Sequence, residues 1–162
     1  MATNRGKQFE KHIQKDFEKV AGVSIDRIHD QTTGFKGSTN ISDFIVYKEP
    51  YEYYIECKTT HEKSLPFRNI SDNQMKGMLE KSKIPGVAAG VICWFIECDT
   101  TIYYPIQLLA EMKNQGMKSV RYDSFVPGRI YLCGQKKRLF YDYDMAGLLH
   151  ELEWRFNIGH EN

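Results

Sequence analysis

The chain has 162 residues, the usual size of one domain and enough to bury a stable core without disulfides or metals. Its composition, 41% hydrophobic, 13% aromatic and 27% charged, excludes a disordered, collagen-like or coiled-coil protein. The 22 Lys and Arg residues nearly balance 21 Asp and Glu, so the net charge of +1 does not identify a nucleic-acid partner. The longest apolar run, residues 87–96, is about half of the ~20 residues that span a bilayer, and no apolar segment follows the basic N-terminal residues. We therefore expect one soluble, cytoplasmic domain over residues 1–162, with no membrane contact.

The first half of the chain is predicted to form one helix and three strands. In chain order these are a helix over residues 5–20, a short strand over 23–29, a turn-rich loop over 31–40, and two strands, 41–47 and 53–60, joined as a hairpin by residues 48–52. Residues 61–70 show no regular pattern and are expected to be irregular.

The second half opens with a clear helix signal at Ser71. Ser71 and Gln74 have the spacing of a capping box, and Ile70 with Met75 can form the hydrophobic staple beside it. The elements predicted after this helix are strands over 87–98 and 101–104, a helix over 105–115, strands over 129–133 and 138–143, and a last helix capped by Asp144 and running through 154. This order, αβββαββαββα, predicts an α/β domain with a mixed central sheet flanked by helices.

The four cysteines are Cys57, Cys93, Cys98 and Cys133. They show no CxxC pairing and no nearby paired histidines, and three of them lie in apolar or strand-like runs. Buried free thiols are therefore favoured over zinc ligands or disulfides.

The predicted hairpin carries a group of charged residues that can converge. Side chains alternate across a strand, so Glu56 and Lys58 share one face, about 7 Å apart at ~3.3 Å per residue, while Ile55 and Cys57 face the core. Asp43 lies on the adjoining strand and can reach the same face. Two carboxylates and one ammonium are thus expected together near the end of the hairpin.

This donor set suits a phosphodiester hydrolase. Mg²⁺ prefers one or two carboxylates and keeps waters for substrate phosphate and nucleophile, which fits Asp43 and Glu56, with the backbone carbonyl of Cys57 as an extra ligand. Lys58 can orient the attacking water or share its proton. A second reading stays open, because an E-x-K pair on a strand with a nearby Asp is also typical of a solvated face or a surface salt-bridge cluster.

These residues resemble a known motif. Asp43 followed by Glu56-Cys57-Lys58 resembles the PD-(D/E)xK nuclease signature, and the surrounding segments are similar to RecU-type Holliday junction resolvases. The segments that carry the likeness are Asn4-Arg5-Gly6 with Glu10, Ser64-Leu65-Pro66-Phe67, Asn69-Ile70 with Gln74, Gly116-Met117-Lys118-Ser119-Val120-Arg121, and the final helix.

The resemblance implies a restriction-endonuclease-like fold and a homodimeric endodeoxyribonuclease that depends on Mg²⁺ or Mn²⁺. Such an enzyme nicks two symmetric strands of branched DNA, a four-way junction, and leaves 5′-phosphate and 3′-hydroxyl ends. Carried onto this chain, the likeness makes Asp43, Glu56 and Lys58 the catalytic core. Glu10 matches the family's helix-borne acidic metal ligand, and Gln74 matches the position on the following helix that helps to arrange the site.

Four basic residues around the expected site are candidate DNA contacts, namely Lys36, Lys63, Arg68 and Lys76. The family carries a long stalk before the catalytic Asp, whereas this chain has only the short loop of residues 31–40 at that place. Two alternatives to a junction resolvase therefore stay open: a phage or restriction-like nuclease with another DNA substrate, and a DNA-binding module with the same fold and no turnover.

Overall fold

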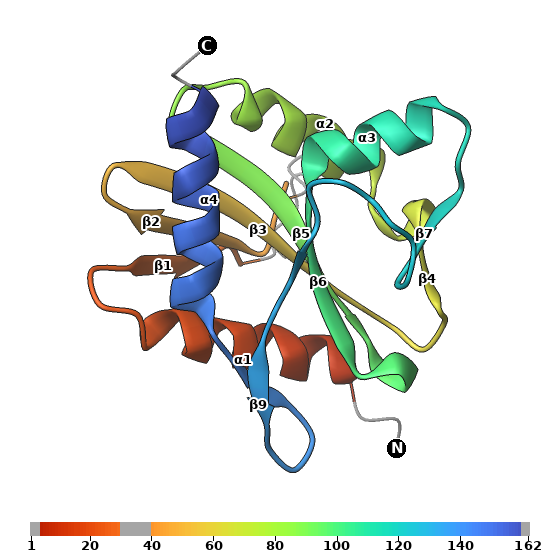
Figure 1. The fold of residues 1–162 in the computed structure, drawn as a ribbon, viewed down its shortest axis with the longest axis horizontal. Helices are drawn as coiled ribbons and strands as arrows, with labels where there is room; N and C mark the ends of the chain where they lie inside the picture. The colour runs from red at the N-terminus through yellow and green to blue at the C-terminus, as the bar shows by residue number, and fades with distance from the viewer. Residues whose placement is uncertain (1–3, 30–39, 160–162) are drawn as a thin grey trace.

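The structure is a computed structural model that describes residues 4–29 and 40–159, with helices packed on both faces of a central sheet (Figure 1). The helices are α1 (Arg5–Glu18), α2 (Asp72–Ser82), α3 (Ile106–Asn114) and α4 (Met145–Gly159), with short 3-10 turns η1 (Phe67–Asn69) and η2 (Ile96–Cys98). The strands are β1 (Ser24–Arg27), β2 (Phe44–Lys48), β3 (Tyr51–Thr60), β4 (Ser64–Pro66), β5 (Val87–Phe95), β6 (Thr100–Pro105), β7 (Ser119–Arg121), β8 (Ile130–Tyr131), β9 (Gly134–Lys136) and β10 (Tyr141–Tyr143).

The main sheet is mixed, as the sequence predicts. Its six strands run in the order β1-β2-β3-β5-β6-β8. The pair β3 and β5 is parallel, and its connection carries α2, as parallel neighbours require a crossover; the other pairs are antiparallel. Two further two-stranded ribbons, β4 with β7 and β9 with β10, stand outside this sheet.

Each face of the sheet has its own apolar core. One core packs Met75 and Met78 of α2 and Leu109 of α3 against strand residues such as Val91. The other core packs α1 and α4 against the opposite face, where Ile55 and Cys57 point. Figure 1 shows α4 crossing in front of the sheet on this second side. Because both faces are covered, β5 is buried along nearly its whole length and reads as a continuous apolar run.

The capping signals in the sequence correctly predict where the helices start. The Asn4 side chain accepts from the Lys7 amide at 3.1 Å at the start of α1, and the capping box of Ser71 and Gln74 is present at the start of α2. The predicted Asp144 cap is also confirmed, since its carboxylate accepts from the Gly147 amide at 2.9 Å. The first helix ends at Glu18 rather than at residue 20.

The short strands were the least predictable elements. Residues 61–70 are not wholly irregular, because they contain β4, which pairs with β7 from a distant part of the chain. The predicted strands over 129–133 and 138–143 shrink to β8 and β10, and β9 lies between them. β4 and β8 are defined by partners that are distant in the chain, and β9 and β10 by each other across a short turn. All of these strands are too short for their own sequence to show the alternation that predicts a strand.

Two further predictions concern the membrane and the thiols. No helix in the described part of the chain is long and apolar enough to cross a membrane. All four cysteines are free; Cys57 and Cys93 are buried, Cys98 is half-buried and Cys133 is exposed. The expectation of free thiols is confirmed, and Cys133 departs from the expectation of burial.

Candidate active site

The site begins where β2 starts alongside β3. The antiparallel register ends with Phe44 opposite Ile55, so β2 offers no backbone partner to the Cys57 amide. Asp43, which immediately precedes β2, fills that place: its Oδ2 accepts from Cys57 N at 2.8 Å, and its own amide donates to the Ile55 carbonyl at 3.1 Å. Asp43 therefore lies just before β2, at the end of the ladder, whereas the sequence predicted it to lie within the strand over residues 41–47.

Glu56 is a buried carboxylate with two donors on a single oxygen. Its side chain shares the expected face with Lys58, and the residue is only 3% exposed, which rules out the solvated-face reading. Oε1 accepts from Lys58 Nζ at 3.0 Å and from Gln74 Nε2 at 2.9 Å. Oε2 is buried and has no hydrogen-bond partner among the described residues. A buried carboxylate oxygen left without a donor is costly, and a cation is one partner that would satisfy it.

Burial shifts the proton equilibrium of this carboxyl group. Burial away from water, together with the negative charge of Asp43, raises the pKa of Glu56 to about 7. The charge of Lys58 and the hydrogen bonds from Lys58 and Gln74 lower this pKa, but by less. Two carboxyl groups held close together in a poorly solvated place therefore compete for one negative charge. A divalent cation relieves that repulsion.

Gln74 links the start of α2 to this carboxylate. Its Oε1 accepts from the Ser71 amide at 3.1 Å, which closes the capping box and fixes the orientation of the amide. The Nε2 end then points to Glu56. The role that the resemblance implied for Gln74, arranging the site, has a direct geometric counterpart.

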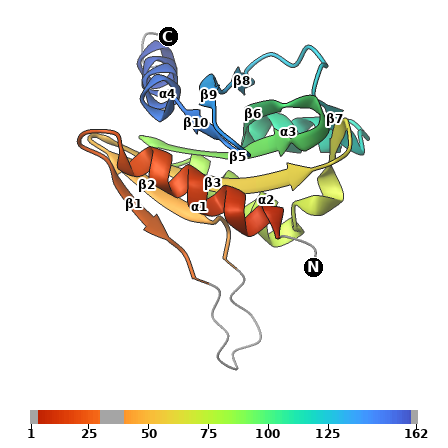
Figure 2. The same cartoon turned by 90° about the horizontal axis from the view of Figure 1, so that it is seen from below.

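Glu10 approaches from α1 on the other side of the sheet edge. Its Oε2 accepts from Arg27 Nη2 at 2.9 Å, and both side chains are partly buried. Glu10, Asp43, Glu56 and Gln74 together line a small cavity of about 140 Å³. The cavity borders the region where α1 runs beside β1 and β3 (Figure 2).

The backbone of Cys57 also faces this region. Its N–H points to Asp43, and a strand residue directs its N–H and C=O to the same side. The carbonyl therefore points away from β5, toward the edge beyond the start of β2, on the side of Asp43. The thiol points to the other side of the sheet, into the core, and burial raises its pKa well above the usual range.

The structure describes three of the four residues that the sequence predicts to contact DNA. Lys63, Arg68 and Lys76 are exposed, on the β3–β4 turn, on η1 and on α2 respectively, and none of them lines the small cavity. Lys36 lies outside the described residues.

Sequence reasoning missed several residues around the cavity. Besides the four predicted residues, its lining includes Lys7, Arg27, Ile28, His29, Asn40 and Ser42. Arg27 is the last residue of β1, and the amide of its neighbour Ile28 donates to the Asp43 carbonyl at 2.8 Å. That pairing depends on the β1–β2 register, which the sequence does not reveal.

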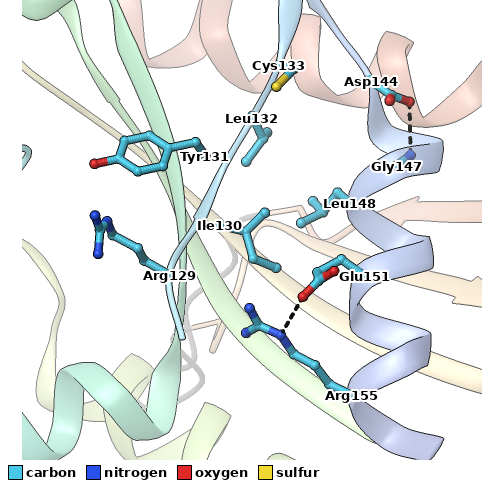
Figure 3. A pocket seen from close by; sticks show the side chains of 10 residues that line it. All are labelled: Arg129, Ile130, Tyr131, Leu132, Cys133, Asp144, Gly147, Leu148, Glu151 and Arg155. Atoms are coloured by element: carbon cyan, nitrogen blue, oxygen red, sulfur yellow. Dashed lines mark hydrogen bonds and ion pairs between the residues drawn. The ribbon is translucent and has the colours of Figure 1, made fainter. Parts of the chain in front are cut away.

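A larger hollow between the 129–133 segment and α4 has a different character (Figure 3). Arg155 is held there by Glu151 at 3.2 Å and by the Gly128 carbonyl at 2.6 Å, so its charge is already compensated. This hollow lies at the β8 edge of the sheet, away from Glu56 and Asp43.

A second acidic cluster joins α1 to the β9–β10 ribbon. His12, Asp16 and Asp142 could by their spacing hold a metal ion. Asp16, however, accepts from the Tyr143 amide at 2.9 Å and pairs with Lys19 at 3.2 Å, and Lys137 lies 3.7 Å from Asp142. With these lysines as counter-charges, the cluster is explained as a structural lock between the two elements.

The comparisons with known proteins concern the family and the fold of the chain. Residues 7–143 match the family described as RecU, Recombination protein U. No curated protein sequence matches the chain. Among solved structures, the chain is similar to Archaeoglobus fulgidus Hjc, a Holliday junction resolvase from an archaeal hyperthermophile, with a TM-score of 0.52 and 20% identity over 74% of this chain and 88% of that one. The structural likeness confirms the restriction-endonuclease-like fold, and the family match, which spans most of the sequence, establishes that the chain belongs to the RecU family.

Proposed function

We propose that this protein is a Holliday junction resolvase, a divalent-metal-dependent endodeoxyribonuclease that makes paired symmetric nicks in four-way DNA junctions. The observation that carries the proposal is the buried Oε2 of Glu56, which lacks a donor among the described residues, in a residue that lines the same cavity as Asp43. Membership of the RecU family and the named activity of the structural neighbour support the choice of DNA substrate.

The residues of the cavity fit a hard divalent cation. Asp43 and Glu56 offer carboxylate oxygens, Cys57 offers its backbone carbonyl, and Glu10 offers a further carboxylate that Arg27 holds in place. Oxygen donors of this kind are what Mg²⁺ and Mn²⁺ prefer. When bound, the ion neutralises charge on the scissile phosphate and favours ionisation of the attacking water.

The remaining polar residues have positioning and proton-handling roles in this proposal. Lys58, 3.0 Å from Glu56, places an ammonium beside the phosphate, where it can orient the water and share its proton. Gln74 holds Glu56 through Oε1, and Oε2 is left without a hydrogen bond from the described residues. Exposed Lys63, Arg68 and Lys76 would add contacts to DNA phosphates.

We also propose that residues 1–162 form one nuclease domain that acts as a homodimer. A four-way junction offers two equivalent strands, and symmetric nicks require one site on each of two subunits. A protein with this substrate works in the cytoplasm, where cellular DNA is accessible to it.

The test is incubation of the protein with a labelled mobile four-way junction, with and without Mg²⁺, mapping nicks on every strand. Asp43→Ala and Lys58→Ala should abolish cutting while DNA binding survives, because each removes a group of the proposed chemistry but no exposed DNA contact. Normal cleavage by either variant would disprove the assignment of the site.

The two alternatives predict different outcomes of the same assay. A phage or restriction-like nuclease would cut flap, duplex or single-stranded DNA in preference to the four-way junction. A binding module without turnover would bind these substrates and cut none of them with any divalent metal.

A further inference from the structure

A second cavity, of about 680 Å³, opens next to the start of α2. Its walls come from η1, the first residues of α2, the end of α3 and residues 116–118. Of the sequence-predicted DNA contacts that the structure describes, Arg68 alone lines it.

The charges around this cavity leave two cations without partners. Asp72 is the one carboxylate among the described lining residues, and Lys113 pairs with it at 3.0 Å. Arg68 and Lys118 are exposed, and their side chains make no hydrogen bond or ion pair with any described residue. The cavity therefore presents two uncompensated positive charges, an arrangement that attracts an anion.

The floor of the cavity is apolar. Phe67 and Ile70 are each only 2% exposed and close its base, while Met117 is 42% exposed at its rim. A purely anionic ligand gains little from such a surface. A nucleotide gains from it, because its sugar and base are apolar enough to rest against the methionine while its phosphate faces the cations.

Two hydrogen bonds connect this cavity to the candidate active site. Ser71 lines the cavity, and its amide donates to Gln74 at 3.1 Å. Gln74 in turn donates to Glu56 at 2.9 Å. The distance from the cavity wall to the catalytic carboxylate is therefore short enough to be covered by one or two nucleotides of a strand.

We propose that this second cavity is a nucleotide subsite, in which Arg68 and Lys118 bind a backbone phosphate one or two positions from the cleaved bond. This inference rests on the proposed DNA substrate. It goes beyond that proposal by naming where the cut strand would be bound, next to the proposed metal-binding residues. Lys118, which the sequence reading did not select as a DNA contact, becomes a substrate-binding residue.

The first experiment measures DNA binding without cleavage. A fluorescently labelled four-way junction is titrated in EDTA at several salt concentrations with the wild type, Arg68→Ala, Lys118→Ala and the double variant. Lys15→Ala is the matched control, because Lys15 is an exposed lysine of α1, on the opposite face of the sheet. Each single cavity variant should lower the slope of log K against log salt by about 0.7 to 0.9 and weaken binding roughly fivefold to tenfold at 0.1 M salt, and the double variant should have the larger effect on both.

The second experiment locates the phosphate. Junctions that carry one neutral methylphosphonate, one or two positions from the mapped nick, should bind the wild type more weakly than the unmodified junction. Lys118→Ala should not weaken the binding of these modified junctions any further, because the phosphate charge that Lys118 would contact is already absent.

These results separate the subsite from the proposed catalysis. Slopes for Arg68→Ala and Lys118→Ala equal to that of Lys15→Ala would overturn the subsite even if the wild type cuts junctions normally. Lowered slopes in a protein that cuts no DNA would support the subsite and reject the proposed nuclease activity.

Discussion

Replacement of Glu56 by Gln should make the metal-free protein more stable at pH 8, although it removes a central residue of the site. In the folded state the pKa of Glu56 is raised from 4.5 to about 7, mainly by burial. The folded protein therefore binds this proton more tightly than the unfolded chain does, and its stability falls as the pH rises from about 4.5 to about 7 and then levels off.

The size of the effect follows from the shift. One pKa unit corresponds to about 1.4 kcal/mol, so a fully ionised Glu56 costs about 3 kcal/mol of the free energy of unfolding. A glutamine side chain is never charged, so the stability of Glu56→Gln relative to the wild type should rise by about 2 to 3 kcal/mol between pH 5 and pH 8. Effects of pH on groups that do not interact with Glu56 are shared by both proteins and cancel in this difference.

Urea unfolding in EDTA at several pH values, followed by circular dichroism, measures this difference. Glu18→Gln is the control, because Glu18 is exposed and its substitution should change stability equally at both pH values. Adding Mg²⁺ at pH 8 should stabilise the wild type, by about 2.7 kcal/mol at a concentration 100 times Kd, and leave Glu56→Gln nearly unchanged. A stability difference that stays constant with pH in EDTA would refute the view that Glu56 is held at the expense of stability.

Three further substitutions test other contacts. Gln74→Glu keeps the acceptor for the Ser71 amide, but it replaces the donor to Glu56 by a further carboxylate. It should lower the melting temperature in EDTA and reduce junction nicking at least tenfold; unchanged nicking would argue against the positioning role. Gly90→Ala should cost about 1 to 3 kcal/mol in urea unfolding, because the added Cβ would lie 2.3 Å from the Tyr103 ring; an unchanged unfolding midpoint would show that the ring can move aside. Asp16→Asn should destabilise by about 1 to 3 kcal/mol and speed hydrogen exchange at the Tyr143 amide, which donates to Asp16 at 2.9 Å; unaltered exchange would remove the proposed lock between α1 and β10.

The fold was predictable wherever the sequence carries its own periodicity or cap. Phe9, Ile13 and Phe17 define the buried stripe of α1, and Ser71 with Gln74 marks the start of α2. The elements that were missed, such as β4 and β7, owe their existence to pairing between residues far apart in the chain. A three-residue segment contains no periodicity from which to predict that pairing.

The sequence predicted which side chains lie close together, but not how buried they are or which of their atoms are in contact. Alternation along β3 correctly placed Glu56 and Lys58 on one face, and the spacing to Asp43 correctly indicated a shared location. The burial of Glu56 was not visible, because it depends on α2 covering that face of the sheet. Nor could the sequence reveal that both donors approach Oε1, since this requires the positions of Lys58 and Gln74 relative to the strand.

The identity of residue 74 explains how the fold and the site depend on each other. A Glu at the third helical position would cap α2 as well as Gln does, because only an acceptor for the Ser71 amide is needed there. Glu56 requires a donor from the same side chain, and a carboxylate cannot provide one. Only an amide meets both demands, with its oxygen turned to the helix and its nitrogen turned to the site. Because the helix fixes the oxygen of Gln74, it also fixes which oxygen of Glu56 accepts from the amide, and so which one is left without a donor among the described residues.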